Sequence, residues 1–187
     1  MAKSIIDINQ LTLKEHLFYA YANLAMAHIA IDKKQIKFDK YNYAIRAKLY
    51  KGLLTGKMNI KTLFEDEKIK LSIGTKCNYC YSTEQLALDH ILPQKLGGKD
   101  SGDNLIYACK ICNSSKGKKD LMEWMIFKGD DFLPLMIIRR YLKLAINYCI
   151  ENNLMDLKIS EIELEKIPFK ILLIPVKYPS PSKLRLI

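Results

Sequence analysis

The amino-acid sequence predicts an α+β fold, in which a small module of strands and one helix is flanked by N-terminal and C-terminal helices. Apolar residues recur at helical spacing up to about residue 54 and again after the central part of the chain. Residues 76–119 differ, because they are rich in glycine and cysteine and contain two short apolar runs that suit strands. We therefore divide the chain into an N-terminal helical region (1–70), a central module (71–119) and a C-terminal helical region with an extended tail (120–187).

The N-terminal region is expected to hold two helices. Thr12 and Glu15 have the spacing of a capping box, and helical periodicity continues to about residue 30. A second helix is expected over about residues 40–54, with Gly52 near its end. Basic residues on or between these helices either contact DNA or form a solvated face: Lys33, Lys34, Lys37, Lys40, Arg46 and Lys48.

The C-terminal region is also expected to be mainly helical. Its longest helix is predicted over about residues 131–152, with Pro134 in the first turn, where a missing N–H does no harm. Ser160–Glu163 predicts a short helix, and Pro168 and Pro175 bracket a candidate strand. The last segment, KYPSPSKLRLI, is expected to be extended and to form an arm.

The composition is that of an ordinary globular protein, with 49% hydrophobic and 27% charged residues. No apolar run approaches the roughly 18–20 residues of a membrane span, and the N-terminus lacks the apolar core of a secretory signal, so we expect a cytoplasmic protein. Thirty basic residues against 20 acidic ones give a net charge of +10, which favours nucleic acid as a partner. Only four of the basic residues are arginine, so part of this excess could instead reflect genome composition.

Four of the five cysteines form two CxxC pairs, Cys77 with Cys80 and Cys109 with Cys112. In a reducing compartment this pattern favours a metal site over disulfides. Four thiolates from two tight turns suit one tetrahedral Zn²⁺, and such a site has no open position, so the zinc would be structural. Cys149 stands alone in an apolar context and is expected in the core.

The residues between the two CxxC pairs form a second pattern. Asp89–His90 follows an apolar run and precedes Ile91–Pro93, and Gly97–Gly98 predicts a turn. Asn104 begins the next apolar run, and Asn113 lies where the chain should enter a helix. The order DH-I-x-P, GG, NL and C-x-x-C-N-x-x-K-G resembles the HNH endonuclease family, whose core is a ββα-metal fold. The resemblance runs from Cys77 to Gly117, under a quarter of the chain.

The resemblance implies a role for each of these polar residues. His90 would be the general base, and its reference pKa of about 6.5 suits a group that takes a proton from water. Asp89 and Asn113 would bind a catalytic Mg²⁺ or Mn²⁺, ions that prefer such hard oxygen ligands. Asn104 completes the catalytic set by bracing the loop and orienting the histidine. Because adjacent strand residues point to opposite faces, Asp89 and His90 could approach one site only across a bend or strand end.

Lysines near this pattern are candidate contacts to a nucleic-acid backbone: Lys95, Lys116, Lys118 and Lys119. From Lys95 to Lys119 the chain has six lysines against two aspartates. The alternative is that these lysines form a solvated face.

These observations predict a metal-dependent endonuclease that hydrolyses phosphodiester bonds in DNA, with a structural Zn²⁺ and a catalytic Mg²⁺ or Mn²⁺. Double-stranded DNA is the expected substrate. Two biological settings fit, a restriction enzyme that acts as a homodimer and a phage or mobile-element nuclease that nicks as a monomer. The alternatives are a zinc-folded module that binds nucleic acid without cutting it, and a nuclease toxin.

Overall fold

A computed structural model describes residues 7–129 and 133–187 and confirms the α+β class. In the described part, six α-helices accompany one sheet of two antiparallel strands. The elements are α1 (Leu13–Asp32), α2 (Lys40–Leu54), α3 (Leu63–Ile73), β1 (Leu86–His90), β2 (Leu105–Cys109), α4 (Lys110–Lys116), α5 (Leu121–Phe127) and α6 (Leu135–Glu151).

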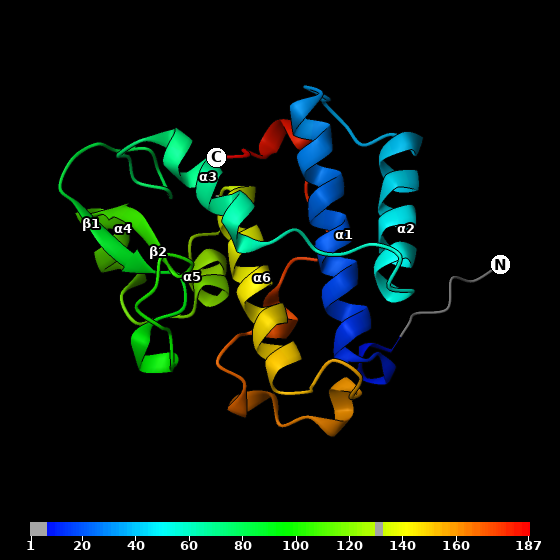
Figure 1. Cartoon of the computed structure of the whole chain (residues 1–187). Helices are drawn as coiled ribbons and strands as arrows, with labels where there is room; N and C mark the ends of the chain where they lie inside the picture. Colours follow the sequence, from blue (N-terminus) through cyan, green and yellow to red (C-terminus); the bar gives the residue numbers. More distant parts are fainter. Residues whose placement is uncertain (1–6, 130–132) are drawn as a thin grey trace.

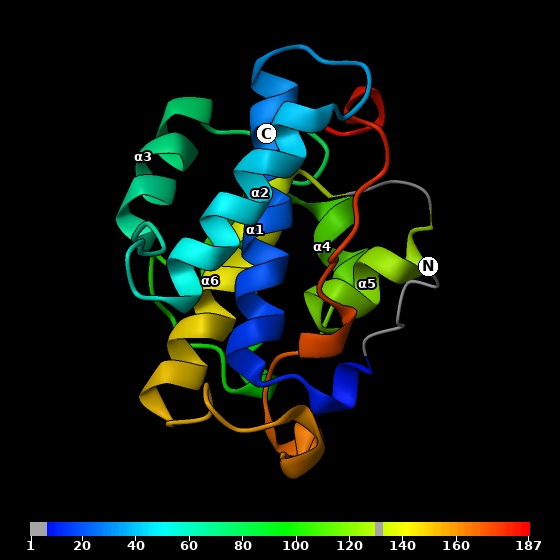
Figure 2. The same ribbon diagram turned by 90° about the vertical axis from the view of Figure 1, so that its right-hand side faces the viewer.

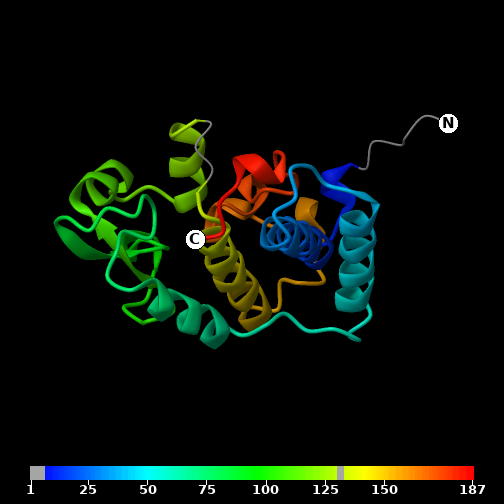
Figure 3. The ribbon, with the colours of Figure 1, turned by 90° about the horizontal axis from the view of Figure 1, so that it is seen from above.

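The elements are arranged in a row. The sheet and α4 lie at one end, α6 and then α1 follow, and α2 forms the opposite end (Figures 1 and 3). Helix α1 packs against α2 on one side and α6 on the other, and α3 packs against α6. None of the described helices is long and apolar enough to span a membrane.

Helix α1 is the central support of the N-terminal half. The predicted capping box is present, with the Thr12 hydroxyl accepting from the Glu15 backbone N–H and the Glu15 carboxylate accepting from the Thr12 N–H. Two further N–H groups of its first turn, at Leu13 and Lys14, donate to carbonyls of residues 157 and 155. Buried residues lie on most sides of the helix, because it is covered by neighbours on opposite faces.

Helix α2 has the predicted bounds, and far fewer of its residues are buried than in α1. Asp39 caps it, accepting from the Asn42 N–H in a second capping box. Only three of its residues are buried: Asn42, Gly52 and Leu53. A Cβ on Gly52 would lie 2.6 Å from Met58, so the glycine lets the linker after α2 return closely against the helix. Most of α2 therefore faces solvent.

Buried charges attach α3 and the central module to α6. Arg140 is fully buried and donates to the carbonyl oxygens of Gly102 (2.6 Å) and Asp103 (3.1 Å) as well as to Glu67 of α3 (2.9 Å). One turn later, Lys143 pairs with the buried Asp66 of α3 at 2.7 Å. Charged groups in the interior are tolerated only when they are paired in this way.

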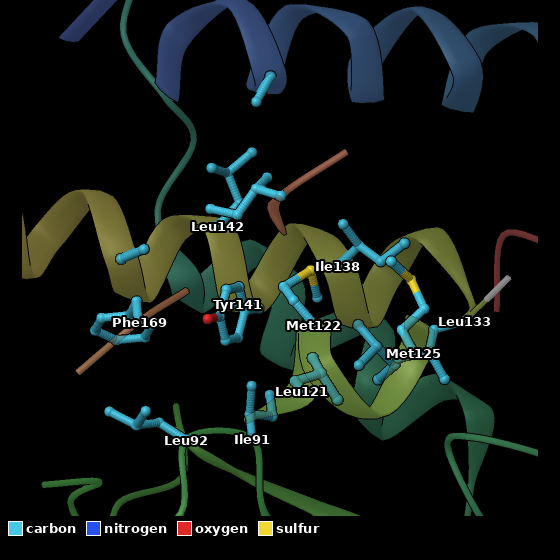
Figure 4. Packing of buried hydrophobic residues seen from close by; sticks show 14 of the residues in the cluster. Ile91, Leu92, Leu121, Met122, Met125, Leu133, Ile138, Tyr141, Leu142 and Phe169 are labelled. Atoms are coloured by element: carbon cyan, nitrogen blue, oxygen red, sulfur yellow. The ribbon is translucent and has the colours of Figure 1, made fainter. Parts of the chain in front are cut away.

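One hydrophobic core joins the three regions of the chain. Ile91 and Leu92, directly after β1, point toward α5 and α6 and pack with Leu121 and Tyr141 (Figure 4). The Tyr141 hydroxyl donates to Asp120 at 2.6 Å and accepts from the Lys170 backbone N–H. The central module therefore shares its core with the flanking helices.

Two expectations for the C-terminal region are wrong. The candidate strand between Pro168 and Pro175 is a 3-10 turn at Ile171–Leu173, because its backbone donors bond locally, as from Leu173 to the Lys170 carbonyl. The last segment is no free arm and runs along the body of the protein (Figure 2). Its carbonyls at residues 185 and 186 accept from the first two N–H groups of α6, which lack a side-chain cap. The predicted start of α6 at residue 131 lies outside the described residues.

Burial of His16 predicts a pH-dependent contribution to stability. The ring is 4% exposed, its Nε2 donates to the Ile171 carbonyl oxygen at 3.2 Å, and burial lowers the His16 pKa below its usual value. The unfolded chain then binds more protons below about pH 6.5, so acidification destabilises the folded state by at most about 1.4 kcal/mol per pH unit for this group.

We expect the free energy of unfolding to fall less steeply between pH 6.5 and 5.5 in His16→Gln than in the parent protein. Urea denaturation at several pH values measures this difference. The comparison cancels other acid-sensitive groups, and parallel pH profiles would contradict the assignment.

Candidate active site

The four paired cysteines converge on one point. Asn78 exchanges hydrogen bonds with the backbone of Tyr107, which holds the turn of Cys77 and Cys80 against the end of β2. All four sulfur atoms lie within 4.8 Å of one another, with 3.6 Å between Cys80 and Cys109. None forms a disulfide. Zn–S bonds of about 2.3 Å in a tetrahedron require S···S separations of about 3.8 Å, so the cluster fits a zinc ion.

The four thiols influence one another's pKa values. Burial raises the pKa of the Cys112 thiol. At Cys109 burial acts in the same direction, but the Cys112 backbone N–H and the neighbouring thiols outweigh it and lower its pKa to about 7. The thiols therefore compete for charge, and four adjacent thiolates require a metal ion to balance them. Cys149 is buried away from this cluster, as expected.

Asp89 lies on the face of β1 that is turned toward the interior. The residue is 6% exposed, and its carboxylate accepts from the Tyr79 hydroxyl at 2.8 Å and from the Lys116 ammonium at 3.1 Å. Lys116 also donates to the backbone carbonyl of His90 at 2.6 Å. Burial lowers the Lys116 pKa, and the nearby Asp89 carboxylate opposes this shift. Asp89 is thus a buried carboxylate paired with an ammonium group.

This position differs from the surface contact that we predicted for Lys116. Its side chain is 1% exposed and its ammonium points into the module, so in this arrangement it is not available to a phosphate. The pairing has a simple cause, because Asp89 would otherwise be a buried carboxylate without a counter-charge. Asn113 lies one turn earlier on α4 and is half-buried, on the same side of the helix as Lys116.

His90 is the last residue of β1, opposite Leu105. Its side chain is 22% exposed, and Nε2 lies 3.2 Å from a carboxylate oxygen of Asp100. A carboxylate only accepts, so Nε2 carries the proton in this contact and Nδ1 of the neutral ring is left as a proton acceptor. Among the described residues, the ring forms no hydrogen bond with Asp89 or Asn113.

Asn104 fastens the loop between the two strands. Its side-chain amide accepts from the Leu92 N–H at 2.8 Å and donates to the carbonyls of Leu92 and Lys99, both at 2.9 Å. Its backbone carbonyl accepts from Ile91. The residue is 2% exposed and so acts by positioning the chain after His90. Gly98 must be a glycine here, because a Cβ would lie 1.8 Å from the Leu92 carbonyl oxygen.

Comparison with known families identifies this segment. Residues 77–119 match the HNH endonuclease family. The match begins at Cys77 and ends at Lys119, so this HNH segment includes the cysteine cluster, both strands and α4. It covers less than a quarter of the chain. No curated protein and no solved structure matches the protein. The HNH segment indicates a nuclease and supports nucleic acid as its partner.

The remaining predicted contacts of the HNH segment lie at its surface. Lys95 belongs to a 3-10 turn at Gln94–Leu96, and Lys118 and Lys119 follow α4; all three are exposed. Lys119 donates to the Ser115 carbonyl, and its ammonium lies over the ring of Phe127.

Sequence reasoning missed two residues of the HNH segment. Tyr79 is fully buried between the first two cysteines, where it holds Asp89 and packs edge-on against Trp124. Asp100 holds His90 from a loop that reads as a glycine-rich turn. An aromatic residue inside a CxxC pair was the only available signal for Tyr79, and nothing in the sequence distinguishes Asp100 from a turn residue.

Loss of a cluster cysteine should remove the metal. We expect Cys77→Ser and Cys112→Ser to lose zinc and the folded structure of the HNH segment, because metal binding contributes much of the folding free energy of such sites. Cys149→Ala is the matched control, since it removes a buried thiol outside the cluster. Zinc content of the purified proteins is the measurement, with one ion per chain expected in the parent and the control. Unchanged zinc in either serine variant would refute the four-cysteine site.

Substitution by alanine should affect stability very differently at two glycines of the same loop. Gly98→Ala is expected to lower the free energy of unfolding by more than about 3 kcal/mol, because the new methyl group overlaps the Leu92 carbonyl and presses on Asn104. Gly102→Ala meets open space and should be tolerated. Urea denaturation of both variants makes the comparison. Equal stabilities would show that the loop does not have the close packing described here.

Proposed function

We propose that this protein is a divalent-metal-dependent endonuclease that hydrolyses phosphodiester bonds in double-stranded DNA. The observation that carries the proposal is the pairing of His90 with Asp100 inside the HNH segment, directly after the buried carboxylate of Asp89. In-line hydrolysis needs an activated water, a cation that neutralises the phosphate charge and a rigid frame that holds the reacting groups in place.

His90 is proposed as the general base. Asp100 accepts from Nε2 and leaves Nδ1 to take a proton from water, and the same carboxylate stabilises the imidazolium that forms. The end of β1 leaves the ring partly exposed, so a substrate can reach it. The Lys116 contact to the His90 carbonyl and the Asn104 contacts to Ile91 and Leu92 hold the backbone that follows the ring.

Asp89 and Asn113 are the residues that would hold the catalytic Mg²⁺ or Mn²⁺. Their oxygen atoms are of the type that these ions prefer. One carboxylate oxygen of Asp89 is occupied by the Lys116 ammonium. The ion would neutralise charge on the phosphate and on the leaving oxygen. Asp89 could bind the ion only by sharing its carboxylate with Lys116 or by exchanging the ammonium for it.

A second candidate, a zinc-folded module that binds nucleic acid without cutting it, is favoured by one observation. Both carboxylate oxygens of Asp89 are already engaged, by Tyr79 and by Lys116. If these contacts are permanent, the Lys116 ammonium competes with a divalent ion for this carboxylate. The four-cysteine cluster and the basic charge are common to both candidates.

Substitution of His90 separates the two candidates. We expect His90→Ala to abolish cleavage of supercoiled plasmid in Mg²⁺ or Mn²⁺ while zinc content, folding and DNA binding are kept. Asp100→Asn should fold normally and cleave about 10- to 100-fold more slowly, because it no longer favours the required tautomer. Rates come from gel assays of the purified variants, with EDTA added to parallel reactions.

The same assay tests the biological proposals. Discrete double-strand fragments from a dimeric protein would support a restriction-type enzyme, and nicked circles from a monomer would support a phage or mobile-element nuclease. Cleavage by His90→Ala at the parent rate would refute the assignment of His90 as the general base. DNA binding without cleavage by the parent protein, in any of these metals, would establish the binding module instead.

A further inference from the structure

Most of the positive charge of this protein is concentrated in one short segment. Residues 33–61 contain nine basic residues and one acidic residue, and so carry +8 of the net +10. Residues 95–119 add +4, which leaves the rest of the chain with a net charge of −2. A compositional preference for lysine would spread the charge along the chain. The observed distribution instead places most of it in residues 33–61, which include α2, whereas the whole HNH segment (77–119) carries +2.

The charge of residues 33–61 is directed to solvent. Lys40, Lys48 and Lys51 are exposed and lie on the face of α2 opposite the one that packs on α1, at helical spacing. In the described part of the chain, no basic residue of this segment pairs with a carboxylate. Lysines elsewhere often do, as Lys14 does with Asp156. We call Lys40, Lys48 and Lys51, the exposed lysines on the outer face of α2, the α2 surface.

Neighbouring residues organise this surface without neutralising it. The segment's only acidic residue, Asp39, uses both carboxylate oxygens in hydrogen bonds to Asn42 and Gln35 at the start of α2. Arg46 donates to Asn23 and lies over the rings of two tyrosines, so it holds α2 to α1 and is not free for a ligand. Concentrated like charge destabilises a fold by repulsion, and an anionic partner would relieve this cost.

The α2 surface and the HNH segment lie at opposite ends of the molecule (Figures 1 and 3). The outer face of α2 points away from α1, and α1 and α6 lie between it and the HNH segment. With packed helices about 10 Å apart, the two basic regions are separated by about 30 Å of nearly neutral protein. A short straight duplex bound at the HNH segment therefore cannot reach the outer face of α2.

We propose that the α2 surface is a second contact for the phosphate backbone of double-stranded DNA, so that each chain holds two separate DNA segments. One DNA duplex is bound at the HNH segment of the protein, and the other is bound at the α2 surface. The inference rests on the proposed function, in that DNA is taken as the substrate. Lysine contacts to phosphate are independent of base sequence and sensitive to salt. The anchor therefore raises the local concentration of DNA without selecting a site.

The test is the binding stoichiometry of an 8-bp DNA duplex, which at about 3.4 Å per base pair is shorter than the separation of the two basic regions. The full-length His90→Ala protein, which keeps its zinc, is titrated at low salt in Mg²⁺, and we expect two duplexes per chain. Adding Lys40→Gln, Lys48→Gln and Lys51→Gln should reduce this to one. The salt dependence of the lost binding event should correspond to about three phosphate contacts, a slope of about −2.7 in log K against log salt. The control carries Lys166→Gln, Lys177→Gln and Lys183→Gln, three exposed lysines outside the α2 surface, and should keep two duplexes.

The outcomes are distinct. Thermal unfolding checks the triple variant, which should be at least as stable as the parent because repulsion is reduced. A parent protein that binds one duplex per chain, with no change on triple substitution, would overturn the inference. Binding of an RNA duplex, but not of a DNA duplex, at the α2 surface would also overturn it. Two-duplex binding by a parent protein that cleaves nothing would refute the proposed nuclease and leave the α2 contact standing.

Discussion

The carboxylate of Asp89 joins three separate parts of the central module. Tyr79 reaches it from the first cysteine turn and Lys116 reaches it from the end of α4. All three side chains are buried, so removal of any one leaves a polar or charged group without its partner in a medium of low dielectric constant. Lys116 also binds the carbonyl of His90, so the position of the proposed base depends on the charge one residue before it.

Local rules were sufficient for the parts of the fold that depend on near neighbours. The capping residue Thr12 and the bounds of α2 follow from short sequence patterns, and the structure confirms them. The convergence of the cysteines was also predictable, because the spacing of two CxxC pairs implies a shared metal. The resemblance to the HNH family located the correct segment because residue identity and spacing agreed throughout it.

Pairings between residues that are far apart in the chain could not be predicted from the sequence. Lys116 lies in a run of lysines that reads as a solvated face, and its burial follows from Asp89 on β1, in a different part of the module. The burial of Arg140 also depends on distant residues, since it donates to carbonyl groups of a loop that no local pattern connects to α6. The tail was misjudged for a related reason. Its role is to accept from the uncapped N–H groups of α6, a requirement that appears only when the two segments are placed side by side.

These internal pairings also change the meaning of the net charge. Lys116, Arg140 and Lys143 are each buried against a carboxylate, so these three pairs cancel in the net charge and contribute little to the field outside the protein. The charge that reaches solvent is therefore more unevenly distributed than the total of +10 suggests. The paired charges fix the HNH segment to the helical body, and the unpaired lysines of α2 face outward at the far end. Because the two kinds of basic residue are separated in this way, we expect that stability and the proposed attraction of DNA can be altered independently in this protein.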